Sequence, residues 1–252
     1  FFRAMYRTAG RSLVGVFFLF LIGWIFYYGN GFTAEDTASG GHTISFNWHA
    51  VLMSISFLVL MGEGAFAFRS HTGIRMEVSS PQRAAAKSKH WLLMGLALGT
   101  GAVGTIAIFV NHVDHGFPNF YSAHSWYGLA TLTLGVVQFV VGFLAFKLNQ
   151  CRPHLRQQLV PFHRVGGMCI LFLAMCTMAL GLFEKQTFVS AKVGKWGGSA
   201  LGLGALAVFL IPLALLFALQ FASPIEQLYT SLSPSSLVDS EGADESPETR
   251  VD

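Results

Sequence analysis

The sequence predicts an all-α, polytopic membrane protein with six transmembrane helices. Of its 252 residues, 53% are hydrophobic and only 12% are charged, about half the charge of an ordinary soluble domain. The mean hydropathy is +0.53. Six segments approach the roughly 20 apolar residues that a bilayer requires, and they cover residues 12–29, 44–68, 91–110, 124–146, 165–183 and 196–222.

Each of the six spans is expected to be helical, because lipid cannot satisfy unpaired backbone groups. We expect the helices to begin a turn or two before the apolar part, since interfacial residues extend them. The five tryptophans fall toward the ends of spans, as in an aromatic belt; they are Trp24, Trp48, Trp91, Trp126 and Trp196. An even number of spans places both termini on one side of the membrane.

Basic residues predict which side that is, because short cytosolic loops are enriched in Lys and Arg. Twelve of them precede the first span or lie in the second and fourth connections: Arg3, Arg7, Arg11, Arg69, Arg75, Arg83, Lys87, Lys89, Lys147, Arg152, Arg156 and Arg164. The first and third connections have none, and the fifth has Lys185, Lys192 and Lys195. Both termini are therefore predicted to be cytosolic.

The chain divides into a membrane domain, residues 1–222, and an acidic tail, residues 223–252. The tail is rich in Ser, Pro, Asp and Glu, so we expect it to be disordered in the cytosol. Within it, Tyr229–Leu232 fits the tyrosine-x-x-apolar pattern of endosomal and lysosomal sorting signals, although a pattern this short also arises by chance. The expected location is an endosomal, lysosomal or other vesicle membrane, or the plasma membrane.

One histidine lies near the start of each of the second to fifth spans. Because successive helices alternate in direction, His49 and His124 fall near one face and His90 and His163 near the other. A membrane histidine can simply bond a neighbouring helix, yet the matched depth within both pairs favours a shared function. Ionisable groups inside a membrane indicate functional sites, and imidazole is a common axial ligand of haem iron.

Two histidines on one iron leave no open coordination position, which favours electron transfer over oxygen activation. Zinc is the competing metal, but it takes four ligands and no second set accompanies either pair. With no CxxCH motif for covalent attachment, the expected cofactors are two haem b groups, with irons roughly 20 Å apart in a core about 30 Å thick. Since no dinucleotide or P-loop motif occurs either, no nicotinamide, flavin or nucleoside-triphosphate cofactor is expected. No nucleic-acid partner is expected.

Five short motifs surround these histidines: Asn47–Met53, Lys87–His90, Asn119–Gly128, Pro161–His163 and Gly181–Lys185. In this order and spacing they resemble the cytochrome b561 family, the transmembrane ascorbate-dependent oxidoreductases. The resemblance implies a four-helix haem-binding core formed by the second to fifth spans, and a homodimer. It also implies electron transfer from cytosolic ascorbate to monodehydroascorbate or Fe(III) on the lumenal or extracellular side.

The resemblance further implies substrate sites on both faces, with no catalytic side chain. Arg83, Lys87 and Arg156 match the basic residues that the family uses to hold ascorbate, a monoanion that fixed cations attract. The positive-inside rule alone also accounts for these charges.

On the opposite face, His112, Asn119 and Tyr121 match the family's outer substrate site, and Asp114 and His115 lie in the same connection. Glu63 resembles part of a family Gly-Glu-Ala motif. Its side chain has three possible roles that the sequence does not separate: a protonated acid, a partner of a haem propionate, or a partner of another helix.

Two other functions fit the same spans. A haem-binding or sensing membrane protein without steady reductase turnover would keep the histidines but lack reduction by ascorbate. A structural or transport protein with incidental histidines would bind no haem.

Overall fold

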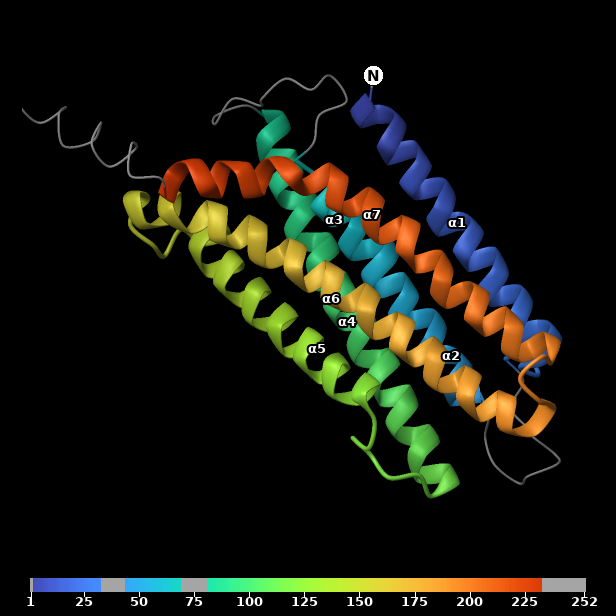
Figure 1. The fold of residues 1–252 in the computed structure, drawn as a ribbon. Coiled ribbons are helices and arrows are strands. Elements are labelled where there is room, and N and C mark those ends of the chain that lie inside the picture. The colour runs from blue at the N-terminus through green and yellow to red at the C-terminus, as the bar shows by residue number, and fades with distance from the viewer. Residues whose placement is uncertain (1, 33–43, 69–80, 233–252) are drawn as a thin grey trace, which may run out of the picture.

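The computed structural model describes residues 2–32, 44–68 and 81–232, with side chains described within 8–32, 46–68 and 81–218. The described residues form six helical segments, and consecutive segments run antiparallel (Figure 1). They are α1 (Phe2–Tyr28); α2 (Ile44–Ser54), continued by the π-helix η1 (Ile55–Met61) and by α3 (Gly62–Ala65); α4 (Pro81–His115); α5 (Ala123–Gly142), continued by the π-helix η2 (Phe143–Lys147); α6 (Pro153–Val193); and α7 (Gly198–Leu232). All six are long and apolar enough to cross a membrane, which confirms the predicted all-α membrane fold.

The longest helices extend well beyond the apolar spans. α4 begins ten residues before its span and α6 twelve before its own, which is about three turns each. α6 opens at Pro153, where a fixed φ suits the first helical turn. Arg83, Lys87 and Arg156 therefore lie on helices and not in loops, and the connection between α5 and α6 is short.

α1 begins and α7 ends at the same end of the bundle (Figure 1), as the even number of spans predicts. We call this the inner end and the opposite one the outer end; that the inner end faces the cytosol stays a prediction. α7 continues to Leu232, so the first ten residues of the predicted tail are helical. Residues 233–252, and Arg69 and Arg75 of the second connection, lie outside the described residues.

Four helical segments form a ring, in which α2 with η1 packs against α4, α4 against α5, α5 against α6, and α6 against η1. α7 packs on the outside of α6, and α1 on α7. In this ring, α2 lies opposite α5, and α4 lies opposite α6. These are the two diagonals that the histidine pairs occupy.

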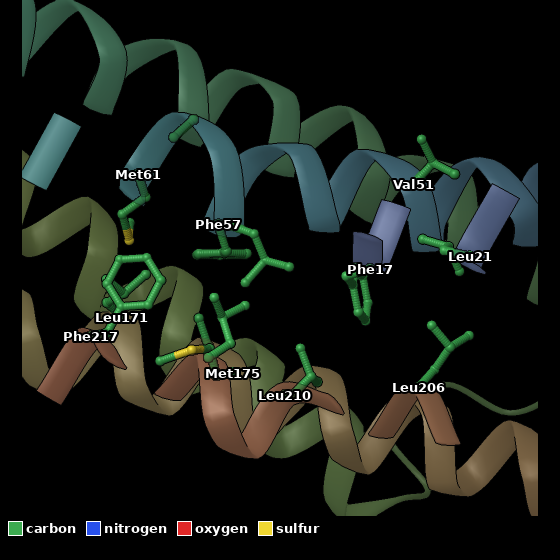
Figure 2. Packing of buried hydrophobic residues seen from close by; sticks show 14 of the residues in the cluster. Phe17, Leu21, Val51, Phe57, Met61, Leu171, Met175, Leu206, Leu210 and Phe217 are labelled. Atoms are coloured by element: carbon green, nitrogen blue, oxygen red, sulfur yellow. The ribbon is translucent and has the colours of Figure 1, made fainter. Parts of the chain in front are cut away.

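The buried apolar cluster lies between this ring and the two outer helices. The members labelled in Figure 2 are Phe17, Leu21, Val51, Phe57, Met61, Leu171, Met175, Leu206, Leu210 and Phe217. Since lipid is as apolar as these side chains, their close van der Waals contact is what stabilises the helix association. The cluster fixes the positions of α2 and α6, which each carry one haem-ligand candidate.

Candidate haem sites and the polar sites beside them

The outer pair consists of His49 on α2 and His124 on α5, whose ring centroids are 6.1 Å apart. Each ring is oriented by a backbone carbonyl. His49 Nδ1 lies 2.9 Å from the Gly104 oxygen, and His124 Nδ1 lies 2.9 Å from the Thr177 oxygen. A carbonyl can only accept, so both Nδ1 atoms carry the proton and both Nε2 atoms are left for a metal.

The inner pair repeats this separation. The ring centroids of His90 on α4 and His163 on α6 are also 6.1 Å apart, and His90 Nδ1 lies 2.8 Å from the Gly64 oxygen. His163 differs, because its buried Nδ1 has no hydrogen-bond partner among the described residues. Instead, Gln138 of α5 donates its side-chain amide to the His163 backbone carbonyl at 2.5 Å, which fixes the helix turn that carries the ring.

Both separations suit axial ligation of one iron. A metal–imidazole bond of about 2 Å, added to a ring radius of about 1.1 Å on each side, places the two centroids roughly 6 Å apart. The described residues hold no group of three or more His, Cys, Asp or Glu side chains that could bind a metal ion together. A four-ligand zinc site therefore does not fit the described residues, whereas two bis-histidine haem sites do.

Two glycines leave room for the imidazole rings. A Cβ added at Gly181 on α6 would lie 2.7 Å from His124 Cε1, and one added at Gly142 on α5 would lie 2.6 Å from His163 Cε1. Real Cβ atoms essentially never approach a non-bonded atom this closely. Sequence reasoning did not assign this role, because a glycine's partner on another helix depends on how each helix is rotated about its axis.

The two pairs are well separated along the bundle. His90 and Gly104, which serve different pairs, are fourteen residues apart on α4, or about 21 Å at a rise of about 1.5 Å per residue. On α6, His163 and Gly181 are eighteen residues apart, or about 27 Å. The pairs therefore lie toward opposite ends of a core about 30 Å thick.

The structure brings together the basic residues expected at the inner end. Lys87 lies within electrostatic range of Arg83, Arg156 and Lys147. Arg156 also donates to Asn149 Oδ1 at 2.7 Å. The four cations thus form one positive cluster beside the inner pair. From the sequence, Lys147 was interpreted only as a marker of membrane orientation.

Trp91, which follows His90 in the sequence, lies beside this basic cluster. Lys147 Nζ is 5.1 Å from the centroid of its ring, a cation–π contact. The buried indole Nε1 of Trp91 has no hydrogen-bond partner among the described residues. A buried donor of this kind is uncommon and is available to an acceptor that the described residues do not supply.

The three residues expected at the outer end also lie together. His112 Nδ1 is 2.8 Å from Asn119 Oδ1, and the ring centroids of His112 and Tyr121 are 6.3 Å apart. His112 is close enough to His49 for their charges to interact, so this group lies beside the outer pair. His115 does not join it; its Nδ1 bonds the Asn111 carbonyl at 2.8 Å.

Glu184 is a member of the outer group to which the sequence reasoning gave no role. Its carboxylate accepts from Ser122 Oγ at 2.9 Å and from the Tyr121 hydroxyl. Burial, together with this hydrogen bond and the charge of Glu184, raises the pKa of Tyr121 to about 12. Thr177, Gly181 and Glu184 follow at spacings of four and three, so one face of α6 holds the start of α5.

Two further charged residues have partners that the sequence did not predict. Arg11 of α1 donates to both carboxylate oxygens of Glu63, from Nε at 2.5 Å and from Nη2 at 2.6 Å. Of the three roles left open for Glu63, the structure thus favours the contact with another helix. Lys185 lies on α6 and not in a connection, with Nζ 3.8 Å from the centroid of the Phe46 ring.

Six membrane-spanning helices with a bis-histidine pair toward each end define the class of integral membrane proteins built for transmembrane electron transfer. Residues 48–189 match the model of the eukaryotic cytochrome b561 family. The chain belongs to that family.

Three similar proteins are informative. The ascorbate-specific transmembrane electron transporter 2 of Zea mays is 32% identical over 78% of this chain and 80% of its own length. The transmembrane ascorbate ferrireductase 1 of Arabidopsis thaliana is 31% identical, with 80% of each chain covered. The lysosomal membrane ascorbate-dependent ferrireductase CYB561A3 of Mus musculus is 34% identical over 71% of this chain and 69% of its own length.

Proposed function

We propose that this protein transfers electrons across the membrane through two haem b groups, from ascorbate at the inner end to monodehydroascorbate or Fe(III) at the outer end. The observation that carries the proposal is the repetition of one geometry. Two histidine pairs, each with centroids 6.1 Å apart, lie toward opposite ends of the same four-helix ring. One such pair supports binding of a haem, whereas two pairs toward opposite ends of the bundle support electron transfer from one side of the membrane to the other.

Four histidines would hold the cofactors through Nε2: His49 with His124, and His90 with His163. When bound, the haem groups supply the one-electron chemistry, since each iron alternates between Fe(III) and Fe(II). The carbonyls that accept from Nδ1 orient three of the four rings and raise the basicity of those ligands. With two imidazoles held for each iron, the sites would favour electron transfer over binding of oxygen.

At the inner end, the basic cluster suits an anionic donor. Arg83, Lys87, Lys147 and Arg156 raise the local concentration of the ascorbate monoanion and offer charge-assisted hydrogen bonds to its enediolate oxygens. The relatives whose names specify ascorbate support this choice of donor. Trp91 Nε1, a buried donor beside this cluster, is suited to an oxygen of the donor or of the haem.

At the outer end, the polar group suits an oxygen-rich acceptor. The contact with Asn119 Oδ1 places the proton of His112 on Nδ1 and leaves Nε2 as an acceptor. The high pKa of Tyr121, about 12, keeps its hydroxyl protonated, so that it donates to Glu184 and does not act as a phenolate ligand. The Asn119 side-chain amide can donate to an oxygen of monodehydroascorbate or of a ferric chelate, and His112 Nε2 can accept from a hydroxyl group of monodehydroascorbate.

The location and assembly follow from the same reasoning. We propose that both termini face the cytosol, because the inner end carries the basic cluster. The named relative in the lysosomal membrane supports a vesicle membrane, and a plasma membrane location is the alternative. A homodimer is expected from the family.

A visible absorption spectrum of the purified protein, recorded before and after ascorbate, tests the proposal. We expect two haems per chain and reduction of both by ascorbate. His49→Ala should remove one haem while His90→Ala removes the other, because the two residues serve different pairs. A protein with haem that ascorbate cannot reduce would be a binding or sensing protein instead, and loss of both haems in His49→Ala would contradict the pairing.

A further inference from the structure

The ion pair between Arg11 and Glu63 joins α1, a helix without haem ligands, to the segment beside the inner haem site. The contact is a two-point fork, with Nε and Nη2 of Arg11 each bonded to one carboxylate oxygen of Glu63. A bidentate pair fixes orientation as well as distance. The two side chains are 52% and 26% exposed, so the pair lies at the surface of the bundle, outside the packed cluster.

The residue after Glu63 touches a haem ligand directly. The Gly64 carbonyl accepts the hydrogen bond from His90 Nδ1 at 2.8 Å. Gly64 is also pressed against the next turns of α4, since an added Cβ would lie 2.9 Å from Met94 Cε and 3.3 Å from Leu93 Cβ. Glu63 and Gly64 therefore hold one short piece of backbone between α1 on one side and α4 on the other.

The rest of this segment is packed from further sides. The Phe66 ring stacks on Phe217 of α7, with centroids 5.4 Å apart, and the Phe68 ring lies 5.4 Å from His90. The segment follows the π-helix η1, where the regular helical register is interrupted. The Gly64 carbonyl also accepts from the Ala67 backbone N–H at 3.2 Å. Because the helical register is interrupted just before this segment, side-chain contacts with other helices add to this local bond in orienting the carbonyl.

We infer that Arg11 is a positioning residue for the inner haem, acting through Glu63 and the Gly64 carbonyl on His90. The inference rests on the proposed two-haem function. A carbonyl that accepts from Nδ1 makes the imidazole a more basic ligand, which stabilises Fe(III) relative to Fe(II). Loosening the fork lengthens this hydrogen bond, and the midpoint potential of the inner haem then rises relative to that of the outer haem.

The loss of the Arg11 charge alone predicts a shift of the inner midpoint potential in the opposite direction, so substitutions of Arg11 distinguish the two explanations. Removing a cation near a haem stabilises the more positive Fe(III) state and lowers the midpoint potential. Arg11→Gln thus raises the inner potential if positioning dominates and lowers it if simple electrostatics dominates. Arg11→Lys keeps the charge but loses the planar fork, so it isolates the positioning effect.

The experiment is a spectroelectrochemical titration of the full-length holoprotein, with electron paramagnetic resonance of its two ferric haems. In Arg11→Lys and Arg11→Gln, the Fe(III)/Fe(II) ratio of the inner haem at a fixed potential should fall three- to tenfold. That change corresponds to about 28–59 mV at about 59 mV per tenfold for a one-electron couple. The outer haem is the internal control, and Arg7→Gln, one turn earlier on α1, is the control for loss of charge at this helix end.

An inner potential that stays constant or falls in both Arg11 variants overturns the inference, as does an equal shift of both haems. If Arg11→Gln does not yield folded protein, the test rests on Arg11→Lys, in which the midpoint potential of the inner haem should rise by the same amount. Failure of the underlying function has a different result, because the unaltered protein would then bind fewer than two haems.

Discussion

Replacing Gly181 with alanine should displace the outer haem while leaving the inner one in place. The His124 ring lies directly over this glycine. An alanine Cβ would stand 2.7 Å from His124 Cε1, 2.9 Å from Nδ1 and 3.2 Å from Nε2. All three neighbours belong to the ring itself, so no flexible chain end can move aside to accept the methyl group.

The size of the effect follows from these distances. Carbon atoms in contact prefer separations of about 3.5–4.0 Å, so the ring must move by roughly 1 Å. Metal–ligand distances tolerate changes of only about 0.2 Å. A shift several times that tolerance breaks the bond from His124 Nε2 to iron or forces α5 and α6 apart, and in either case the outer bis-histidine centre is lost or strongly altered.

The assay compares haem content per chain and the two ferric haem signals in variants matched for chemistry. Gly142→Ala is the reciprocal change, since its Cβ would meet His163 Cε1 at 2.6 Å, and it should affect the inner haem alone. Gly23→Ala is the control, because nothing lies within 4 Å of its added Cβ and α1 carries no haem-ligand candidate. Alanine is favoured over glycine in a helix by roughly 1 kcal/mol, so this control should keep both haems with unchanged or improved stability.

The reasoning would be refuted if Gly181→Ala kept both haems with unaltered potentials and resonance signals. It would also be refuted if Gly181→Ala and Gly142→Ala removed the same haem. Either result would mean that His124 and His163 do not ligate separate haems beside these glycines.

Three further predictions concern the two substrate sites. Neutralising Lys87 and Arg156 together should raise the apparent KM for ascorbate roughly tenfold or more, because a charge-assisted hydrogen bond contributes about 1.5–3 kcal/mol. Reduction by dithionite is the control. Unchanged ascorbate kinetics would leave these residues only a role in membrane orientation. In vesicles loaded with ascorbate, His112→Ala should slow reduction of external Fe(III) or monodehydroascorbate while both haems stay reducible from inside, and full external activity would place the acceptor elsewhere. Glu184→Gln should lower the pKa of Tyr121 from about 12 while leaving it above its ordinary value, because burial, the largest cause of the shift, remains when the carboxylate no longer opposes the phenolate. An ultraviolet pH titration of this variant, with and without Tyr121→Phe, checks the shift. An unchanged titration would contradict the contact.

The sequence by itself determined the membrane class and the two histidine pairs. Whether a segment spans a bilayer depends on its own transfer free energy, which is a sum over neighbouring residues. Depth in the membrane then follows from position along each span, so His49 could be matched with His124, and His90 with His163, before any contact was known. The gathering of basic residues at the inner end was also predictable, since their distribution among the connections is a property of the sequence alone.

Only the tertiary structure decided which side chains meet. Arg11 and Glu63 are 52 residues apart, and Ser122 and Glu184 are 62 apart; both contacts depend on how each helix is rotated about its axis. Hydropathy does not specify that rotation in a membrane protein, because lipid-facing and protein-facing positions are similarly apolar. The same rotation determines that Gly181 lies beneath His124 and that the Gly64 carbonyl faces His90, so the candidate ligands could be paired from sequence while the groups that orient them could not.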